Sequence, residues 1–325
     1  MKDGRKRIVE YLRVSVTDRC NFRCTYCMPE EGISCMAHDE ILRFEEILKV
    51  CKSMAKLGVK KIKLTGGEPL VRKNLIELIK GIHQIEGIEE ITLTTNGLLL
   101  GESLEELIEA GITSINISLD TLDKKRFKEI TRVDGLEKVL DVIHQVAQSK
   151  LKSVKVNALI AKNLNEDDIL SLVALAKDEM IHVRFIEIMP IGLGKDLVPM
   201  KKQEIMAKIE AAFGKLTPYQ GRLGNGPSVY YTLENFKGKI GFISAVSDCF
   251  CDNCNRVRLT ADGFLKLCLH SKSGIDLKAL LRNGVEEQEL TKKINDAIIN
   301  KPERHHFGEE ETLEVENKIM AQIGG

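Results

Sequence analysis

The strongest constraint on the fold is an alternation of short apolar segments with amphipathic helical segments, from Leu12 to about Phe213. About six βα units of this kind predict an α/β fold, a partial (βα)6 barrel of the TIM type with too few strands for eightfold closure. A flat doubly wound sheet would show the same alternation, so the periodicity leaves that architecture open. The predicted strands are rich in β-branched residues, as buried parallel strands should be; they are LRVSVT, KIKLT, ITLTT, SINISL, SVKVNALI and HVRFIEIM.

The residue pattern changes after Thr217, where turn-forming residues become frequent. Closely spaced Gly, Asn and Pro residues around short apolar segments predict antiparallel hairpins as far as Asp248. A helical pattern follows near Asp276–Asn300. We therefore divide the chain into a barrel, a C-terminal α+β extension and a polar tail, over residues 1–215, 216–300 and 301–325.

Composition and charge exclude several classes of partner. Lys plus Arg and Asp plus Glu both number 48, so no net charge draws the chain to nucleic acid or to an anionic membrane. The charged N-terminus lacks the apolar segment of a signal peptide, and no segment approaches the roughly 18 apolar residues of a membrane span. We expect a cytoplasmic location.

The nine cysteines are unevenly distributed, which in a reducing compartment favours metal binding over disulfides. Cys20, Cys24 and Cys27 follow the first predicted strand, where a parallel α/β fold carries its chemistry. A [4Fe–4S] cluster takes four ligands, so three thiolates in one loop leave one iron open to another molecule. A structural zinc ion would need a fourth ligand from the chain, and zinc or free thiols are therefore weaker interpretations.

The spacing of Cys20, Cys24 and Cys27, with Tyr26 before the last of them, resembles the radical S-adenosylmethionine superfamily. In that superfamily S-adenosylmethionine chelates the open iron and is cleaved to a 5′-deoxyadenosyl radical. The GGEP segment Gly66–Pro69 ends the next predicted strand and matches the superfamily segment that meets the methionyl amine. Considered alone, GGEP would indicate only a turn.

A second group of cysteines lies in the C-terminal region. Cys251 and Cys254 form a CxxC pair, and Cys268 comes after a predicted hairpin. Three ligands would again leave one metal position open. With Cys249 as a fourth ligand the group would form a closed zinc site or a fully protein-ligated cluster, and the residues alone do not separate these options.

Arg256 and Arg258 follow the CxxC pair. Two residues apart on a strand, both side chains point to the same face. Neighbouring guanidinium groups repel each other unless an anion lies between them, and Arg suits phosphate. We favour a polyphosphate ligand over a solvated strand face, although most Arg side chains are exposed.

Eight features occur in a fixed order: CxxxCxxC, GGEP, TTNG, KVN, RFIE-M, FCxxCNRxR, a further cysteine, and a terminal Gly-Gly. Together they resemble the GTP 3′,8-cyclase family, the radical enzymes that start molybdenum cofactor biosynthesis, over essentially the whole chain. The resemblance implies that the C-terminal extension carries a second [4Fe–4S] cluster, whose open iron faces guanine. The implied ligands are Cys20, Cys24 and Cys27 for the first cluster, and Cys251, Cys254 and Cys268 for the second.

The resemblance also implies the other site residues. S-adenosylmethionine would contact Tyr26, Gly66, Gly67, Glu68, Ser118 and Met189. GTP would be held by Arg13, Lys63, Thr94, Lys155, Arg256 and Arg258. The residues expected to act in the catalytic pocket are Arg184, Arg256, Arg258, Gly324 and Gly325. Considered by residue type alone, Thr94 and Ser118 could equally be strand caps and Met189 could equally belong to the core. The tail could equally be a frayed terminus.

The implied reaction is removal of the ribose C3′ hydrogen of GTP and bonding of C3′ to guanine C8, giving 3′,8-cyclo-7,8-dihydro-GTP. The implied partners are an electron donor such as flavodoxin or ferredoxin, the next enzyme of the pathway (cyclic pyranopterin monophosphate synthase) and a second copy in a homodimer. Two features depart from the family: Lys63 replaces its common Arg, and Cys249 is an extra thiol. The rival hypotheses are a two-cluster peptide-modifying maturase, which leaves Arg256 and Arg258 without a role, and a non-catalytic zinc-binding module.

Overall fold

The computed structural model describes residues 1–151, 153–221, 223–224, 226–307 and 318–324. Its centre is a single twelve-stranded sheet in the order β12-β11-β10-β1-β2-β3-β4-β5-β6-β9-β8-β7. The middle of this sheet confirms the six predicted strands, which lie in chain order and pair in parallel. They are β1 (Tyr11–Ser15), β2 (Lys61–Thr65), β3 (Glu90–Thr95), β4 (Ser114–Ser118), β5 (Ser153–Leu159) and β6 (Ile181–Ile186).

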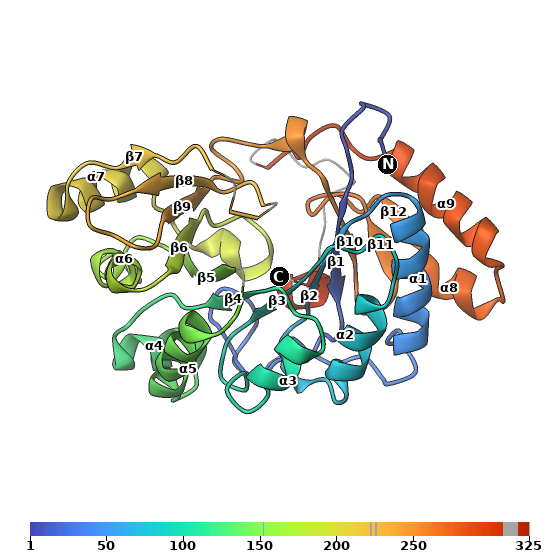
Figure 1. Ribbon diagram of the computed structural model, residues 1–325, viewed down its shortest axis with the longest axis horizontal. Helices are drawn as coiled ribbons and strands as arrows, with labels where there is room; N and C mark the ends of the chain where they lie inside the picture. The colour runs from blue at the N-terminus through green and yellow to red at the C-terminus, as the bar shows by residue number, and fades with distance from the viewer. Residues whose placement is uncertain (152, 222, 225, 308–317, 325) are drawn as a thin grey trace.

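Helices connect these strands and lie in an arc around the outside of the sheet (Figure 1). In the first of them, Ile47, Cys51 and Met54 are fully or almost fully buried on one face, which confirms that Cys51 belongs to the core. Gly58, at a φ of +93°, ends this helix because a left-handed residue cannot continue it. The helices are α1 (Phe44–Lys56), α2 (Leu75–His83), α3 (Leu104–Glu109), α4 (Lys124–Thr131), α5 (Leu136–Gln148), α6 (Ile169–Asp178) and α7 (Lys202–Phe213).

The C-terminal extension contains the predicted hairpins, in which β7, β8 and β9 pair antiparallel, as do β10, β11 and β12. It also continues the barrel sheet, because β9 pairs in parallel with β6 and β10 with β1. The predicted division near residue 215 stays a prediction. The strands are β7 (Thr217–Pro218), β8 (Val229–Thr232), β9 (Ile240–Ile243), β10 (Arg256–Leu259), β11 (Phe264–Lys266) and β12 (Gly274–Asp276).

The remaining helices are α8 (Leu277–Arg282) and α9 (Glu287–Ile299), which confirm the predicted helical stretch, and the short α10 (Met320–Ile323) near the C-terminus. Within the described residues the sheet is open, since its end strands β12 and β7 are not paired with each other. This agrees with a partial rather than a closed barrel. No helix in the described ranges is long and apolar enough to cross a membrane.

Candidate active site

One cavity of about 370 Å³ lies against the parallel strands and brings the two cysteine groups together. Its lining contains all six predicted cluster ligands, although the two groups are more than 200 residues apart in sequence. Most of the other predicted site residues also line it. They are Arg13, Tyr26, Lys63, Gly66, Gly67, Glu68, Thr94, Ser118, Arg184, Met189, Arg256 and Arg258.

The first cysteine loop follows β1 and turns tightly on itself. The backbone N–H groups of Cys27 and Met28 donate to the Cys24 carbonyl at 2.9 and 3.1 Å. Burial raises the pKa of Cys20 to about 11 and that of Cys27 to about 12, and the Cys20 thiol adds to the shift of Cys27. Among the described residues these three thiols are not gathered within 4.8 Å of one another. They are therefore not arranged around a single zinc ion, whose tetrahedral ligands lie within about 4 Å of one another.

The GGEP loop braces the cysteine loop through backbone contacts. The N–H groups of Gly67 and Glu68 donate to the carbonyls of Thr17 and Arg19, both at 2.8 Å. A Cβ atom on Gly67 would lie 2.4 Å from the Arg19 carbonyl oxygen. The requirement for glycine at position 67 therefore comes from the packing of the GGEP loop on the cysteine loop. The contact of Gly67 with S-adenosylmethionine stays a prediction.

Glu68 and Asn96 tie three strand ends together. Burial raises the pKa of Glu68 to about 7, and its carboxylate accepts bonds from the Thr95 hydroxyl at 2.8 Å and the Asn96 N–H at 2.7 Å. The Asn96 amide in turn donates to Asn21, inside the cysteine loop, at 2.7 Å. The loops after β1, β2 and β3 thus form one rigid wall of the cavity.

Asp120 is a site residue to which the sequence analysis assigned no specific role. The Tyr26 hydroxyl donates to one Asp120 carboxylate oxygen at 2.6 Å, and the Leu159 N–H donates to the other at 2.8 Å. Burial raises the pKa of Asp120 to about 6. This aspartate orients Tyr26 against the cavity. Its position just after the end of β4 was the one feature of the sequence that could have indicated a role in the site.

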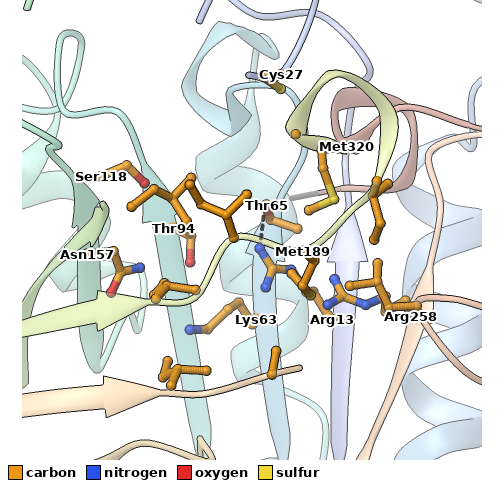
Figure 2. A pocket seen from close by; sticks show the side chains of 18 of the residues that line it. Arg13, Cys27, Lys63, Thr65, Thr94, Ser118, Asn157, Met189, Arg258 and Met320 are labelled. Atoms are coloured by element: carbon orange, nitrogen blue, oxygen red, sulfur yellow. Dashed lines mark hydrogen bonds between the residues drawn. The ribbon is translucent and has the colours of Figure 1, made fainter. Parts of the chain in front are cut away.

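Cations form a row across the floor of the cavity. Arg258 on β10, Arg13 on β1 and Lys63 on β2 are register partners on three neighbouring strands. Figure 2 shows their side chains reaching into the same space, with Met189 close by. Burial and repulsion from neighbouring cations lower the pKa of Arg258 to about 9 and that of Lys63 well below its usual value.

Two buried donors lack partners, one in this row and one on the neighbouring Arg256. The Nε atoms of Arg13 and Arg256 are buried and make no hydrogen bond with any described residue. Leaving a buried donor unpaired costs about 1–3 kcal/mol, and gathering like charges adds to that cost. An anion bound between these guanidinium groups would remove both penalties, so the row has the properties of a polyphosphate site.

Arg184, predicted to act in the catalytic pocket, and Thr94 and Lys155, predicted to bind GTP, lie beside this row. Arg184 donates through Nε to Asn157 at 2.8 Å and through Nη2 to Asn116 at 2.8 Å, which fixes its guanidinium group at the cavity. Thr94 accepts a bond from the Asn116 amide at 3.2 Å. Lys155 is buried and does not line the cavity, but it lies close enough to Arg184 for the two charges to interact.

The C-terminal tail reaches the same cavity. Arg258 donates through Nη1 to the Gly324 carbonyl at 3.0 Å, and Met320 and Ala321 line the cavity. Gly324 has a φ of +87°, and a Cβ there would lie 2.7 Å from Cβ of Ser15. The described end of the tail, residues 318–324, therefore packs against β1 at Gly324. Gly325 lies outside the described residues.

Cys251 and Cys254 precede β10, whereas the first cysteine group follows β1, which runs parallel to β10. Burial and the neighbouring Cys249, Cys268 and Cys254 thiols raise the pKa of Cys251. Burial alone would also raise the pKa of Cys254, but the charges of Lys301 and Arg256 lower it overall. A thiol held near cations in this way is a good metal ligand.

Comparison with known proteins agrees with this geometry. A model of the radical SAM superfamily matches residues 14–176, and a model named Molybdenum Cofactor Synthesis C matches residues 181–307. The crystal structure of SuiB from Streptococcus suis bound to its precursor peptide SuiA superposes with a TM-score of 0.62 at 14% identity. The superposition covers 91% of this chain and 66% of that chain, and at this identity it shows the fold alone.

Fold, cysteine loop and family model together define a radical S-adenosylmethionine protein. Curated GTP 3′,8-cyclases from Clostridium perfringens strain 13 and Pelotomaculum thermopropionicum are 48% and 46% identical to it, each over all of both chains. This chain belongs to the GTP 3′,8-cyclase family. The maturase alternative has only the shared fold in its favour.

Proposed function

We infer that the chain cyclises GTP to 3′,8-cyclo-7,8-dihydro-GTP, the first step of molybdenum cofactor biosynthesis. Family membership supports the reaction. The observation that supports GTP as the substrate is the buried row Arg258–Arg13–Lys63, which lies in one cavity with both cysteine groups. It is a polyphosphate site placed where a nucleoside would lie between two metal centres.

As a radical S-adenosylmethionine protein, the chain uses an iron–sulfur cluster and S-adenosylmethionine. Cys20, Cys24 and Cys27 fit a [4Fe–4S] cluster, and we propose a second one on Cys251, Cys254 and Cys268. When bound, the first cluster and S-adenosylmethionine supply the 5′-deoxyadenosyl radical that takes the C3′ hydrogen. We assign S-adenosylmethionine to the wall formed by Tyr26, Gly66, Gly67, Glu68, Ser118 and Met189.

The protein's own contribution is chiefly to position the substrate. Arg13, Lys63 and Arg258 would hold the triphosphate, and Arg184 is fixed by two asparagine amides before substrate arrives. Holding the ribose and the base in one orientation favours the bonding of C3′ to C8 over diffusion of the substrate radical. The carbonyl of Gly324 accepts a bond from Arg258 and holds Met320 and Ala321 at the cavity, and we propose that these residues limit the access of water.

We also propose the partners that the family implies. They are an electron donor such as flavodoxin or ferredoxin, cyclic pyranopterin monophosphate synthase as the enzyme that consumes the product, and a second copy of this chain. The location proposed is the cytoplasm.

The proposed function is tested by incubating the reduced, reconstituted protein with S-adenosylmethionine and GTP. Formation of 5′-deoxyadenosine should depend on GTP, and ATP should not replace it, because the base is expected to contact the second cluster. Equal 5′-deoxyadenosine with ATP, or none with GTP, would count against a GTP cyclase. Chromatography with mass detection of both nucleosides gives the measurement.

GTP affinity should depend on pH through Lys155. Burial and then the charge of Arg184 lower its pKa to about 7. Lys155 does not line the cavity but lies beside Arg184, so a bound triphosphate would favour its charged amine through space. Binding above pH 7 then takes up a proton, and the affinity falls by less than about tenfold per pH unit as the pH rises. Calorimetry in buffers of different ionisation enthalpy measures this uptake. A Lys155→Met variant that takes up the same number of protons would show that another group is responsible.

A further inference from the structure

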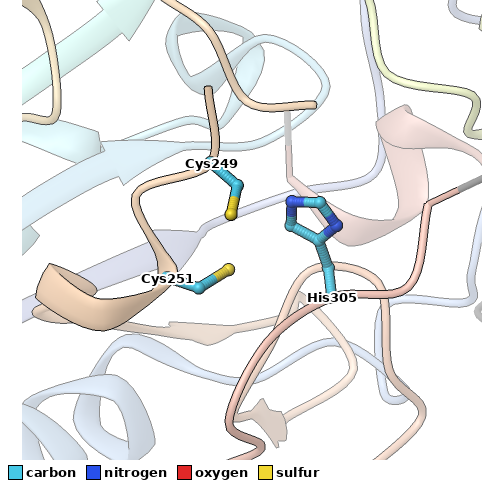
Figure 3. Close-up of side chains that lie close together, drawn as sticks. All are labelled: Cys249, Cys251 and His305. Atoms are coloured by element: carbon cyan, nitrogen blue, oxygen red, sulfur yellow. The ribbon is translucent and has the colours of Figure 1, made fainter. Parts of the chain in front are cut away.

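A different set of metal ligands overlaps the predicted second cluster. The sulfur atoms of Cys249 and Cys251 and a ring nitrogen of His305 all lie within 4.8 Å of one another. Figure 3 shows the two thiols and the imidazole facing a common space. In the part of the chain that the structure describes, no other three His, Cys, Asp or Glu side chains are gathered so tightly.

Two thiolates and an imidazole are the ligands that a single zinc ion prefers. Zinc binds sulfur at about 2.3 Å and imidazole nitrogen at about 2.0–2.1 Å, so its tetrahedral ligands lie within about 4 Å of one another. The observed spacing is within a small side-chain movement of that geometry. Cys249 is exposed, which gives an ion direct access from solvent and leaves room for water as the fourth ligand.

The imidazole of His305 has an unused nitrogen. Its Nε2 atom is buried and has no hydrogen-bond partner among the described residues. The other nitrogen, Nδ1, accepts only a long bond of 3.3 Å from the Phe307 N–H. Zinc binding through Nε2 would give this buried nitrogen a partner without breaking a hydrogen bond that it already makes.

A buried arginine holds the two ligand-bearing segments together. Arg7 pairs with Asp3 through Nε at 2.6 Å, and both side chains are almost fully buried. Its Nη1 atom donates to the carbonyl oxygens of Cys251 at 3.0 Å and Glu303 at 2.6 Å. The loop that carries Cys251 and the segment that leads to His305 are therefore tied together by one side chain, and their proximity is built into the fold.

We propose that Cys249, Cys251 and His305 form a binding site for one Zn²⁺ ion, with water as the fourth ligand. Binding replaces two thiol protons, which are released to solvent. Zinc at this site and the second [4Fe–4S] cluster exclude each other, because both require Cys251. Zinc binding itself does not rest on the proposed reaction; only the exclusion rests on the proposed second cluster.

The zinc site is tested by titrating the cluster-free full chain with Zn²⁺ against a chelating dye. The parent protein carries Cys20→Ser, Cys24→Ser and Cys27→Ser so that the first group cannot bind the ion. Cys249→Ser and His305→Ala should each weaken the tightest zinc binding by at least about 100-fold, since each removes one ligand. Cys268→Ser is the matched control and should change it by less than about threefold, because this cysteine belongs only to the proposed cluster.

Cobalt substitution reports the ligands independently. Co²⁺ bound to the same parent should show tetrahedral bands and sulfur-to-metal charge transfer that Cys249→Ser reduces. Circular dichroism shows whether each variant is folded. Zinc binding that depends on Cys268 but is indifferent to Cys249 and His305 would overturn the assignment.

Mutual exclusion is tested on the otherwise unmodified chain by reconstitution with iron and sulfide. Without zinc it should take up about eight irons, and with zinc present about four. Cys249→Ser should reach about eight in both conditions. An equal loss of iron in Cys249→Ser, or no loss in the wild type, would overturn the exclusion. Uptake of only about four irons without zinc would instead count against the second cluster of the proposed function.

Discussion

Replacing Cys24 with serine should reduce the cleavage of S-adenosylmethionine to the level of a mixture without protein. Serine is a poor ligand for iron, and the loop has only three cysteines with which to hold the first cluster. The variant should also lose about four irons per chain after reconstitution. Iron analysis and chromatography of 5′-deoxyadenosine measure both effects.

Cys35→Ser is the matched control for this experiment. Cys35 is exposed, and its thiol donates to the Ile33 carbonyl at 3.8 Å. Its removal should change neither the iron content nor the activity. Full iron content and full cleavage in Cys24→Ser would show that the first cysteine group is not the site of the cluster.

Replacing Lys63 with methionine should have two opposite effects. It should weaken GTP binding by about 10- to 100-fold, because a charged hydrogen bond to phosphate is worth about 1.5–3 kcal/mol. It should also raise the unfolding temperature of the GTP-free protein, because burial and the charges of Arg184 and Arg13 already disfavour the ammonium group. Calorimetric titration with GTP and thermal unfolding measure the two effects.

Lys61→Met is the matched control on the same strand. Lys61 and Lys63 lie two residues apart on β2, but the Lys61 amine pairs with Glu90 at 3.4 Å. Its loss should leave the GTP affinity unchanged and should not raise the unfolding temperature. If Lys63→Met bound GTP as tightly as the wild type, the cation row would not be the triphosphate site.

Much of the fold could be predicted because the information is local. The six parallel strands and α1 follow from the alternation of apolar residues within each segment, which depends only on neighbours in the chain. The parallel pairing of β9 with β6 and of β10 with β1 was not predicted. A hairpin pattern specifies the partner within the hairpin but not the sheet edge that the hairpin joins.

The site shows the same limit. The spacing of Cys20, Cys24 and Cys27 is local, and the structure places all three at one cavity. Asp120, which orients Tyr26, lies 94 residues away from it in sequence. The sequence shows that Asp120 follows a strand end but not that it contacts Tyr26. His305 and Cys251 are likewise brought together from separate segments. Such contacts depend on how distant loops meet at the ends of the strands.

The central claim, that this chain makes a radical at one end of the cavity and uses it on GTP held by the cation row, is tested most directly with GTP deuterated at C3′. Reduced, reconstituted protein should transfer the deuterium to 5′-deoxyadenosine and form one cyclised guanine product. Mass spectrometry of both nucleosides gives the result. Formation of 5′-deoxyadenosine without deuterium, or no cyclised product while the label stays in GTP, would contradict the account.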